Sequence, residues 1–134
     1  MSIAILAQQK NISLEGAWQV VNWQQISGDS LIWSLPGDIN GSQIKIWSKN
    51  HFLFVGYFQT DSSKSDDYGG GTYKLDGNRY EENLLYFAEK SAIGSTVRLL
   101  IETRSDTLIQ TWPVDENWQV IKNKYNIQKL TRIE

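Results

Sequence analysis

The fold is decided by a hairpin sequence, TYKLDGNRYEENLLY, at residues 72–86. Its centre is Asp76-Gly77, and the Asp-Gly pair is preferred in the two-residue turns of β-hairpins. With the turn on this pair, Tyr73 lies opposite Tyr80, and side chains alternate between the two faces. One face then holds Tyr73, Leu75, Tyr80, Glu82, Leu84 and Tyr86; the other holds Thr72, Lys74, Arg79, Glu81 and Asn83. The first face is mostly apolar, so it is predicted to face inward with a single glutamate on it.

Similar strand signals occupy most of the chain. Segments rich in β-branched and aromatic residues alternate with clusters of Gly, Asn, Asp and Ser. The predicted strands are Trp18–Ile26, Gln43–Ser48, Phe52–Gln59, Thr72–Leu75, Arg79–Phe87, Thr96–Arg104, Thr107–Val114 and Gln119–Ile133, with a weaker one at Leu31–Leu35. The polar stretch 60–71 is predicted to be a loop. About eight or nine short strands at regular spacing predict an all-β fold, a single antiparallel up-and-down β-barrel.

Length and composition indicate one globular domain. A chain of 134 residues is short for two cores, and 40% hydrophobic with 21% charged residues is an ordinary globular balance. The net charge of −2 lacks the basic footprint of nucleic-acid-binding proteins. The chain has no cysteine and no apolar run near the ~18 residues of a membrane helix. We therefore expect no disulfide, no nucleic-acid partner, no membrane span, no metal and no other cofactor.

Residues 1–13 are predicted to be a segment distinct from the domain, which covers residues 14–134. The apolar residues 3–7 (IAILA) followed by 8–10 (QQK) are typical of the end of an export signal and its cleavage region. A full signal has a basic leader and a longer apolar stretch. Two interpretations therefore stay open, a truncated signal or a short segment that packs on the domain. Export to the periplasm is slightly favoured over a cytoplasmic location.

Two further hairpins separate inner from outer faces. A turn at Ser105-Asp106 groups Val97, Leu99, Ile101, Thr103, Leu108, Gln110 and Trp112 on the inside. A turn at Lys49-Asn50 groups Ile44, Ile46, Leu53, Val55 and Tyr57, while the other face carries Trp47, Phe52, Phe54 and Phe58. The face with the aliphatic residues is predicted to be inward. Because both faces of this hairpin are apolar, a cover over its outer face is also expected.

Two short motifs resemble those of lipocalins and fatty-acid-binding proteins. The tripeptide GAW at residues 16–18 begins the first strong strand, and TRI at residues 131–133 ends the last one. In those families an indole closes one end of the barrel and a guanidinium of the last strand packs over it. The resemblance implies that Trp18 and Arg132 close the barrel here, in a cation–π contact worth ~0.5–2 kcal/mol.

The stretch from Lys45 to Glu82 is similar to a family of uncharacterised bacterial lipocalin-like domains, which have calycin-type β-barrels. The residues that carry the resemblance are Lys49-Asn50-His51-Phe52, Gly69-Gly70-Gly71-Thr72-Tyr73, Leu75-Asp76-Gly77 and Tyr80-Glu81-Glu82. The resemblance extends over residues 14–134. It implies a lipocalin-like barrel that holds a small apolar or amphipathic molecule.

The candidate ligand-binding residues are those placed inside that combine rings with polar groups. They are Tyr57, Tyr73, Tyr80, Glu82, Tyr86, Gln110 and Trp112. Small-molecule pockets are built in this way. The same side chains could simply fill the barrel, because eight strands leave an interior just wide enough for either outcome. Glu82 is expected to anchor a ligand, to lie at the barrel mouth or to accept hydrogen bonds from tyrosine hydroxyls.

No catalytic set is predicted. His51 is the only histidine and has no acid–base partner near it in sequence, so neither a nucleophile triad nor a pair of His metal ligands assembles. Glycoside chemistry needs two inward acids, and only Glu82 is placed inward. The glycines at 69–71 lack the Gly-Lys-Ser/Thr of a phosphate loop. The aspartates of the predicted loop lack calcium-loop spacing and are expected to be solvated: Asp61, Asp66 and Asp67.

Two functions are consistent with these patterns. The first is non-catalytic binding of a small apolar or amphipathic ligand, oriented by Glu82 and the tyrosines. The alternative is a structural or interaction protein with a filled barrel, which dimerises through the apolar hairpin at Trp47 and Phe52–Phe58. A barrel-type isomerase that uses Glu82 is a third, minor hypothesis.

Overall fold

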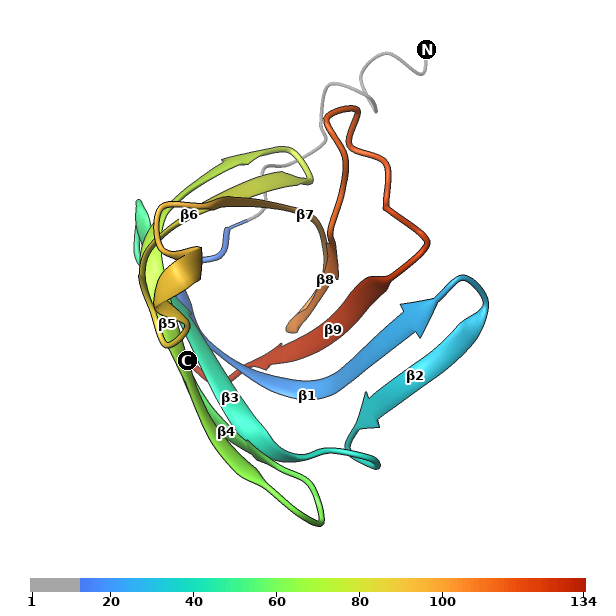
Figure 1. The fold of residues 1–134 in the computed structure, drawn as a ribbon. Coiled ribbons are helices and arrows are strands. Elements are labelled where there is room, and N and C mark those ends of the chain that lie inside the picture. Colours follow the sequence, from blue (N-terminus) through green and yellow to red (C-terminus); the bar gives the residue numbers. More distant parts are fainter. Residues whose placement is uncertain (1–12) are drawn as a thin grey trace.

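The computed structural model describes residues 13–134 and confirms the predicted all-β fold (Figure 1). In these residues the elements are β1 (Gly16–Ser27), β2 (Ser30–Leu35), β3 (Asn40–Trp47), β4 (His51–Gln59), β5 (Lys64–Asp76), β6 (Arg79–Phe87), the 3₁₀ turn η1 (Lys90–Ala92), β7 (Thr96–Arg104), β8 (Thr107–Trp112) and β9 (Tyr125–Arg132). The predicted N-terminal segment lies outside the described residues except for Ser13. Within residues 13–134, no helix has the length and apolar character needed to cross a membrane.

Eight of these strands form a closed antiparallel barrel in up-and-down order. From β3 to β9 each strand pairs with the next, and β1 completes the ring by pairing with both β9 and β3. Only the start of β1, Gly16–Gln19, pairs with β3. Farther along, residues 23–27 of β1 pair with β2, which is an extra strand beside the ring (Figure 1).

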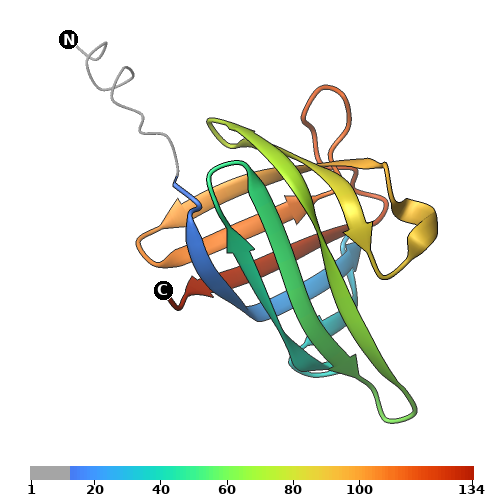
Figure 2. The ribbon, with the colours of Figure 1, turned by 90° about the vertical axis from the view of Figure 1, so that its left-hand side faces the viewer.

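The prediction of a loop at 60–71 is wrong, because β5 begins at Lys64. Its first part, residues 64–72, pairs with β4 at nine successive positions. Ser, Asp and Gly have low strand propensity. The neighbouring strand nevertheless supplies a complete ladder of backbone partners, so tertiary pairing overrides the local preference. The β4–β5 hairpin extends past the neighbouring strands of the barrel (Figure 2).

The hairpin at 72–86 has the predicted faces with a different register. Its turn lies at residues 77–78, one position later than predicted, so Tyr80 is opposite Leu75 instead of Tyr73. Moving a turn by one residue changes each cross-strand partner by two. Since side chains alternate with a period of two, the inner face keeps its members from Tyr73 to Leu84, whereas Tyr86 follows an extra residue in β6 and is exposed.

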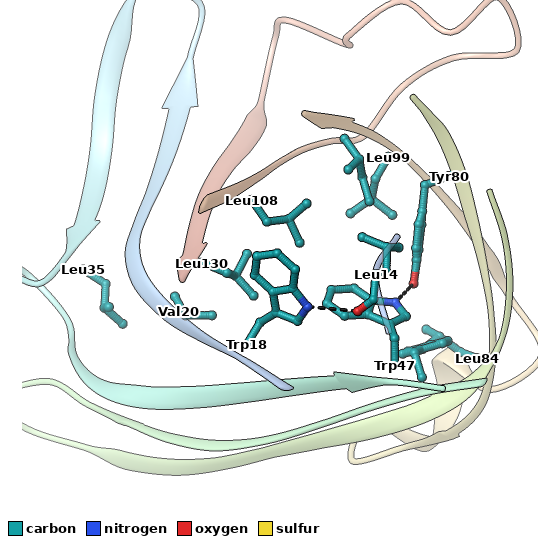
Figure 3. Packing of buried hydrophobic residues seen from close by; sticks show 12 residues of the cluster. Leu14, Trp18, Val20, Leu35, Trp47, Tyr80, Leu84, Leu99, Leu108 and Leu130 are labelled. Carbon is teal, nitrogen blue, oxygen red and sulfur yellow. Dashed lines mark hydrogen bonds between the residues drawn. The ribbon is translucent and has the colours of Figure 1, made fainter. Parts of the chain in front are cut away.

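One end of the barrel is closed by a layer of side chains around Trp18 (Figure 3). Trp18 is fully buried, and its Nε1 donates a hydrogen bond to the Leu14 carbonyl oxygen at 2.9 Å. The Arg132 guanidinium carbon lies 4.2 Å from the Trp18 ring centroid, and Nη1 donates to the Glu15 carbonyl oxygen at 2.8 Å. Trp47 packs edge-on against Trp18 with centroids 6.5 Å apart. The fully buried residues Tyr80, Ile101, Leu108 and Leu130 also belong to this core.

Two β-bulges turn aromatic rings toward the inside of the barrel. Relative to β9, β1 contains one extra residue, Val21; relative to β5, β6 contains one extra residue, Leu85. Because side chains alternate along a strand, an extra residue reverses which later positions face inward. Trp23 and Phe87, each two positions beyond its bulge, therefore face the interior.

Gly69 allows two rings on separate strands to meet. It lies between Phe54 of β4 and Phe87 of β6 in a single row across the sheet. A Cβ at this position would lie 2.6 Å from the Phe54 ring and 2.8 Å from the Phe87 ring. With glycine there, the two rings pack edge to face with centroids 6.0 Å apart.

Candidate functional site

A cavity of about 280 Å³ lies inside the barrel, next to the closed end. Its volume is near the lower limit of the ~300–1,000 Å³ typical of small-molecule sites. Its apolar lining consists of Trp23, Phe54, Leu84, Phe87, Val97, Leu99 and Trp112. Its polar lining consists of Gln43, Lys45, Asp67, Glu82, Gln110 and Gln128. Such a wall has both an apolar surface and fixed hydrogen-bonding groups.

Lys45 and Glu82 form a buried ion pair on this wall. Lys45 Nζ lies 2.5 Å from Glu82 Oε2, and the two side chains are 6% and 8% exposed. Lys45 Nζ also donates to Gln110 Oε1 at 3.2 Å and lies 4.9 Å from the Trp47 ring centroid. Removing two charges from water is unfavourable unless further contacts surround them. These contacts hold the ammonium in one position.

The Tyr80 hydroxyl stabilises the carboxylate of the pair. It accepts a hydrogen bond from Trp47 Nε1 at 2.8 Å and donates one to Glu82 Oε2 at 2.9 Å. Burial raises the pKa of Tyr80 well above its usual 10.0, and the nearby Glu82 charge adds to the rise. The hydroxyl therefore stays protonated and continues to donate.

Three glutamines extend the polar network from Lys45 to Asp67. Gln110, which accepts from Lys45, donates through Nε2 to Gln128 Oε1 at 2.7 Å. Gln128 Nε2 donates to Gln43 Oε1 at 3.4 Å, and Gln43 Nε2 donates to Asp67 Oδ2 at 2.7 Å. Each amide accepts on the side of the ammonium and donates on the side of the carboxylate. The charges at the two ends therefore favour one orientation for every amide.

Gly56 leaves space for the contact between the side chains of Gln43 and Asp67. The three residues form one row across β3, β4 and β5, with the glycine in the middle. A Cβ on Gly56 would lie 2.9 Å from both Cα and Cβ of Gln43. The missing side chain lets the Gln43 amide reach over the intervening strand.

Asp67 gives the cavity wall an excess of negative charge. The charged lining residues are one lysine and two carboxylic acids, and Lys45 is paired with Glu82. Asp67 is half-buried, and burial raises the pKa of its carboxyl above 3.8, while the hydrogen bond from Gln43 opposes this rise. The Asp67 carboxylate is therefore less well solvated than one at the surface.

The structure places five of the seven predicted ligand-binding residues inside the barrel. Glu82, Gln110 and Trp112 line the cavity. Tyr80 and Tyr73 stack on each other with centroids 5.5 Å apart and pack with the core at the closed end, outside the cavity lining.

The predictions that Tyr57 and Tyr86 face inward are wrong, since these residues are 54% and 70% exposed. Tyr86 follows the bulge at Leu85, which turns Phe87 inward in its place. Tyr57 lies on the outer face of the β3–β4 hairpin.

The two faces of the β3–β4 hairpin are exchanged relative to the prediction. The pairing agrees with the expected turn at Lys49-Asn50. Lys45, Trp47, Phe52 and Phe54 face inward, however, whereas Ile46, Leu53, Val55 and Tyr57 are exposed. Lys45 lies on the aromatic face, and a lysine in a sequence normally indicates a face exposed to solvent. Only its contact with Glu82 in the structure shows that this lysine is buried.

Sequence reasoning missed several cavity residues: Trp23, Gln43, Lys45, Asp67 and Gln128. The prediction that Asp67 is solvated is wrong, whereas Asp61 and Asp66 are exposed. The sequence does contain a signal for the inward position of Asp67. Side chains alternate along β5, and Asp67 lies an even number of residues before the inward Leu75. The signal for Trp23 is absent, because a bulge intervenes.

Comparison with protein-family models and with curated proteins gave no match. Within residues 13–134, no group of three or more His, Asp or Glu side chains is arranged to hold a metal ion. The side chains of the cavity wall themselves indicate what the site can do. They present a pre-oriented polar network beside aromatic rings, an arrangement suited to binding.

Removing one member of the buried ion pair should destabilise the protein more than removing both. Lys45→Met leaves the Glu82 carboxylate buried without its cation, and we expect a loss of about 3–5 kcal/mol in the free energy of unfolding. The double variant Lys45→Met/Glu82→Gln removes both charges and should lose less than the single variant. Denaturant unfolding at neutral pH measures both. A double variant that loses as much as Lys45→Met, or more, would contradict the coupling of the two charges.

Asp67→Asn should stabilise the protein at neutral pH. Since the pKa of Asp67 is raised above 3.8, the folded protein binds this proton more tightly than the unfolded chain, and stability falls as pH rises through the raised value. The gain in unfolding free energy of the variant over the unchanged chain should be largest above the raised pKa. It should decline to a constant below pH 3.8. Denaturant unfolding over a range of pH measures it. Asp66→Asn, on the exposed neighbour, is the control; an advantage of Asp67→Asn without pH dependence would contradict the assignment.

Proposed function

We propose that the protein binds a small amphipathic molecule, without catalysis, in the cavity of its barrel. The observation that carries this proposal is the cavity of about 280 Å³ whose wall combines aromatic rings with a connected polar network. Within residues 13–134, every buried polar side-chain atom has a hydrogen-bond partner. The network is therefore already organised before a ligand enters, which reduces the cost of ordering it on binding.

The wall is divided in a way that suits an amphipathic ligand. Trp23, Phe54, Phe87 and Trp112 supply large apolar surfaces, while the glutamines and Asp67 supply polar groups in fixed directions. Sites for small molecules usually combine a mainly apolar lining with a few placed polar groups. A purely structural barrel would instead favour aliphatic side chains that fill the interior at close-packed density.

We also propose that the chain is related to the bacterial lipocalin-like domains that its motifs resemble. The closed eight-stranded barrel is consistent with a calycin-like fold. The Arg132 guanidinium over the Trp18 ring supports a wider relationship to lipocalins and fatty-acid-binding proteins, since the resemblance to those families implies this contact. A shared fold does not by itself give a function, so the binding proposal depends on the cavity.

Filling the cavity should abolish binding. Val97→Trp places an indole on the inner face of β7, and we expect it to remove any co-purifying molecule from the native mass spectrum. It should also weaken binding of 2-phenylethanol, measured by calorimetric titration, by at least about tenfold, or ~1.4 kcal/mol. Glu102→Trp, at an exposed position of the same strand, is the control. Unchanged binding by folded Val97→Trp would contradict the proposal.

An exposed apolar patch favours self-association as a second candidate function. The patch lies on the outer face of β3 to β6 and comprises Ile46, Leu53, Val55, Tyr57, Tyr68, Leu85 and Tyr86. Apolar patches mark interaction sites, and a mainly apolar patch can face its own copy across a two-fold axis. It replaces the predicted surface at Trp47 and Phe52, which are buried.

The patch predicts a dimer, which should dissociate when charged side chains are introduced into the patch. Sedimentation velocity at micromolar concentration should show a dimer for the unchanged chain and a monomer for the double variant Leu53→Lys/Tyr86→Lys. Both residues are exposed, so the variant is expected to fold. A monomeric unchanged chain would exclude this second function at that concentration.

A further inference from the structure

The excess negative charge of the cavity lies at one end of the polar network. Lys45 and Glu82 neutralise each other at 2.5 Å, and three amides separate Lys45 from Asp67. In the described chain the Asp67 carboxylate accepts one side-chain hydrogen bond, from Gln43 to Oδ2 at 2.7 Å. A carboxylate has about four acceptor sites. Asp67 therefore has capacity for a further donor, above all a positively charged one.

Aromatic rings line the same cavity. Trp23 and Trp112 lie with centroids 5.7 Å apart, and Phe54 and Phe87 with centroids 6.0 Å apart. On β5, Asp67 faces inward two positions before Gly69. It therefore lies next to the row that Phe54, Gly69 and Phe87 form across the sheet. The faces of such rings attract cations, most strongly in an environment shielded from water.

The protein already binds one ammonium group in this way. Lys45 Nζ is held by the Glu82 carboxylate and lies 4.9, 5.2 and 5.4 Å from the ring centroids of Trp47, Phe52 and Tyr80. A carboxylate together with several rings thus stabilises a buried cation in this barrel. Asp67 and the cavity rings repeat this combination around space that no side chain occupies.

We propose that the cavity selects a small organic cation, with an amine or ammonium group at Asp67 and an apolar body against the rings of Trp23 and Trp112. This inference rests on the proposed binding function and names its ligand class. An anionic ligand would face two carboxylates, and its one attractive partner, Lys45, is already paired with Glu82. A neutral ligand would leave the charge of Asp67 without compensation.

Three probes that share a phenyl ring and differ in charge test this inference. They are 2-phenylethylamine, 2-phenylethanol and 3-phenylpropanoate, each titrated calorimetrically into the whole chain at neutral pH. The amine should bind about tenfold more tightly than the alcohol, which corresponds to ~1.4 kcal/mol. The propanoate should bind most weakly.

Substitution of Asp67 locates the source of the preference. In Asp67→Asn the advantage of the amine over the alcohol should disappear, so that the two probes bind with equal affinity. The asparagine oxygen can still accept from Gln43, so the variant is expected to fold. Asp66→Asn, which removes the exposed charge next along the strand, should keep the full preference.

Each other result overturns the inference in a distinguishable way. Equal binding of amine and alcohol, or a preference that survives in Asp67→Asn, overturns cation selection and leaves the binding function standing. Tightest binding of the propanoate overturns it and assigns the head group to Lys45. Binding of none of the probes, the alcohol included, counts against the cavity as a binding site and removes the inference with it.

Discussion

The positive charge of a lysine inside a small barrel requires a negative charge and hydrogen-bond acceptors close to it. The polar side chains in the interior of this protein are arranged around Lys45 to meet that requirement. Glu82 supplies the opposite charge for Lys45, and Tyr80, which accepts a hydrogen bond from Trp47, donates to the same carboxylate oxygen that Lys45 contacts. From the ammonium outward, three amides pass hydrogen bonds across β8, β9 and β3 to β5. Gln110 and Gln128 lie on the paired strands β8 and β9, whereas the other contacts of the network connect strands that no backbone ladder joins directly. Polarised chains of hydrogen bonds strengthen their members.

The sequence predicts those features that depend only on alternation. An error of one residue in the turn at 77–78 leaves the faces of that hairpin intact, because partners shift by two. Alternation fails where an extra residue enters a strand, and no local signal marks Val21 or Leu85 as such a residue. It also cannot choose between two apolar faces. On β3 the choice depends on a lysine whose partner lies 37 residues later.

Asp67 combines opposite requirements of stability and of the proposed binding function. Burial raises the pKa of its carboxyl, so at neutral pH its charge opposes folding. Proteins often keep such residues at binding sites, where ligand contacts use the poorly solvated group. The closed end shows the contrast, since Trp18 and Arg132 there satisfy each other and the neighbouring backbone. Rigid packing at one end thus coexists with a poorly solvated carboxylate beside the cavity.

The glycines at 56 and 69 have a consequence for how such a barrel changes over evolution. Each stands between two side chains that meet across it, Gln43 with Asp67 and Phe54 with Phe87. A methyl group at either position would alter the shape of the cavity without replacing any residue that lines it. Substitution at Gly69 would therefore change the cavity shape where the two rings meet, whereas substitution at Gly56 would also disturb the contact between Gln43 and Asp67 in the polar network.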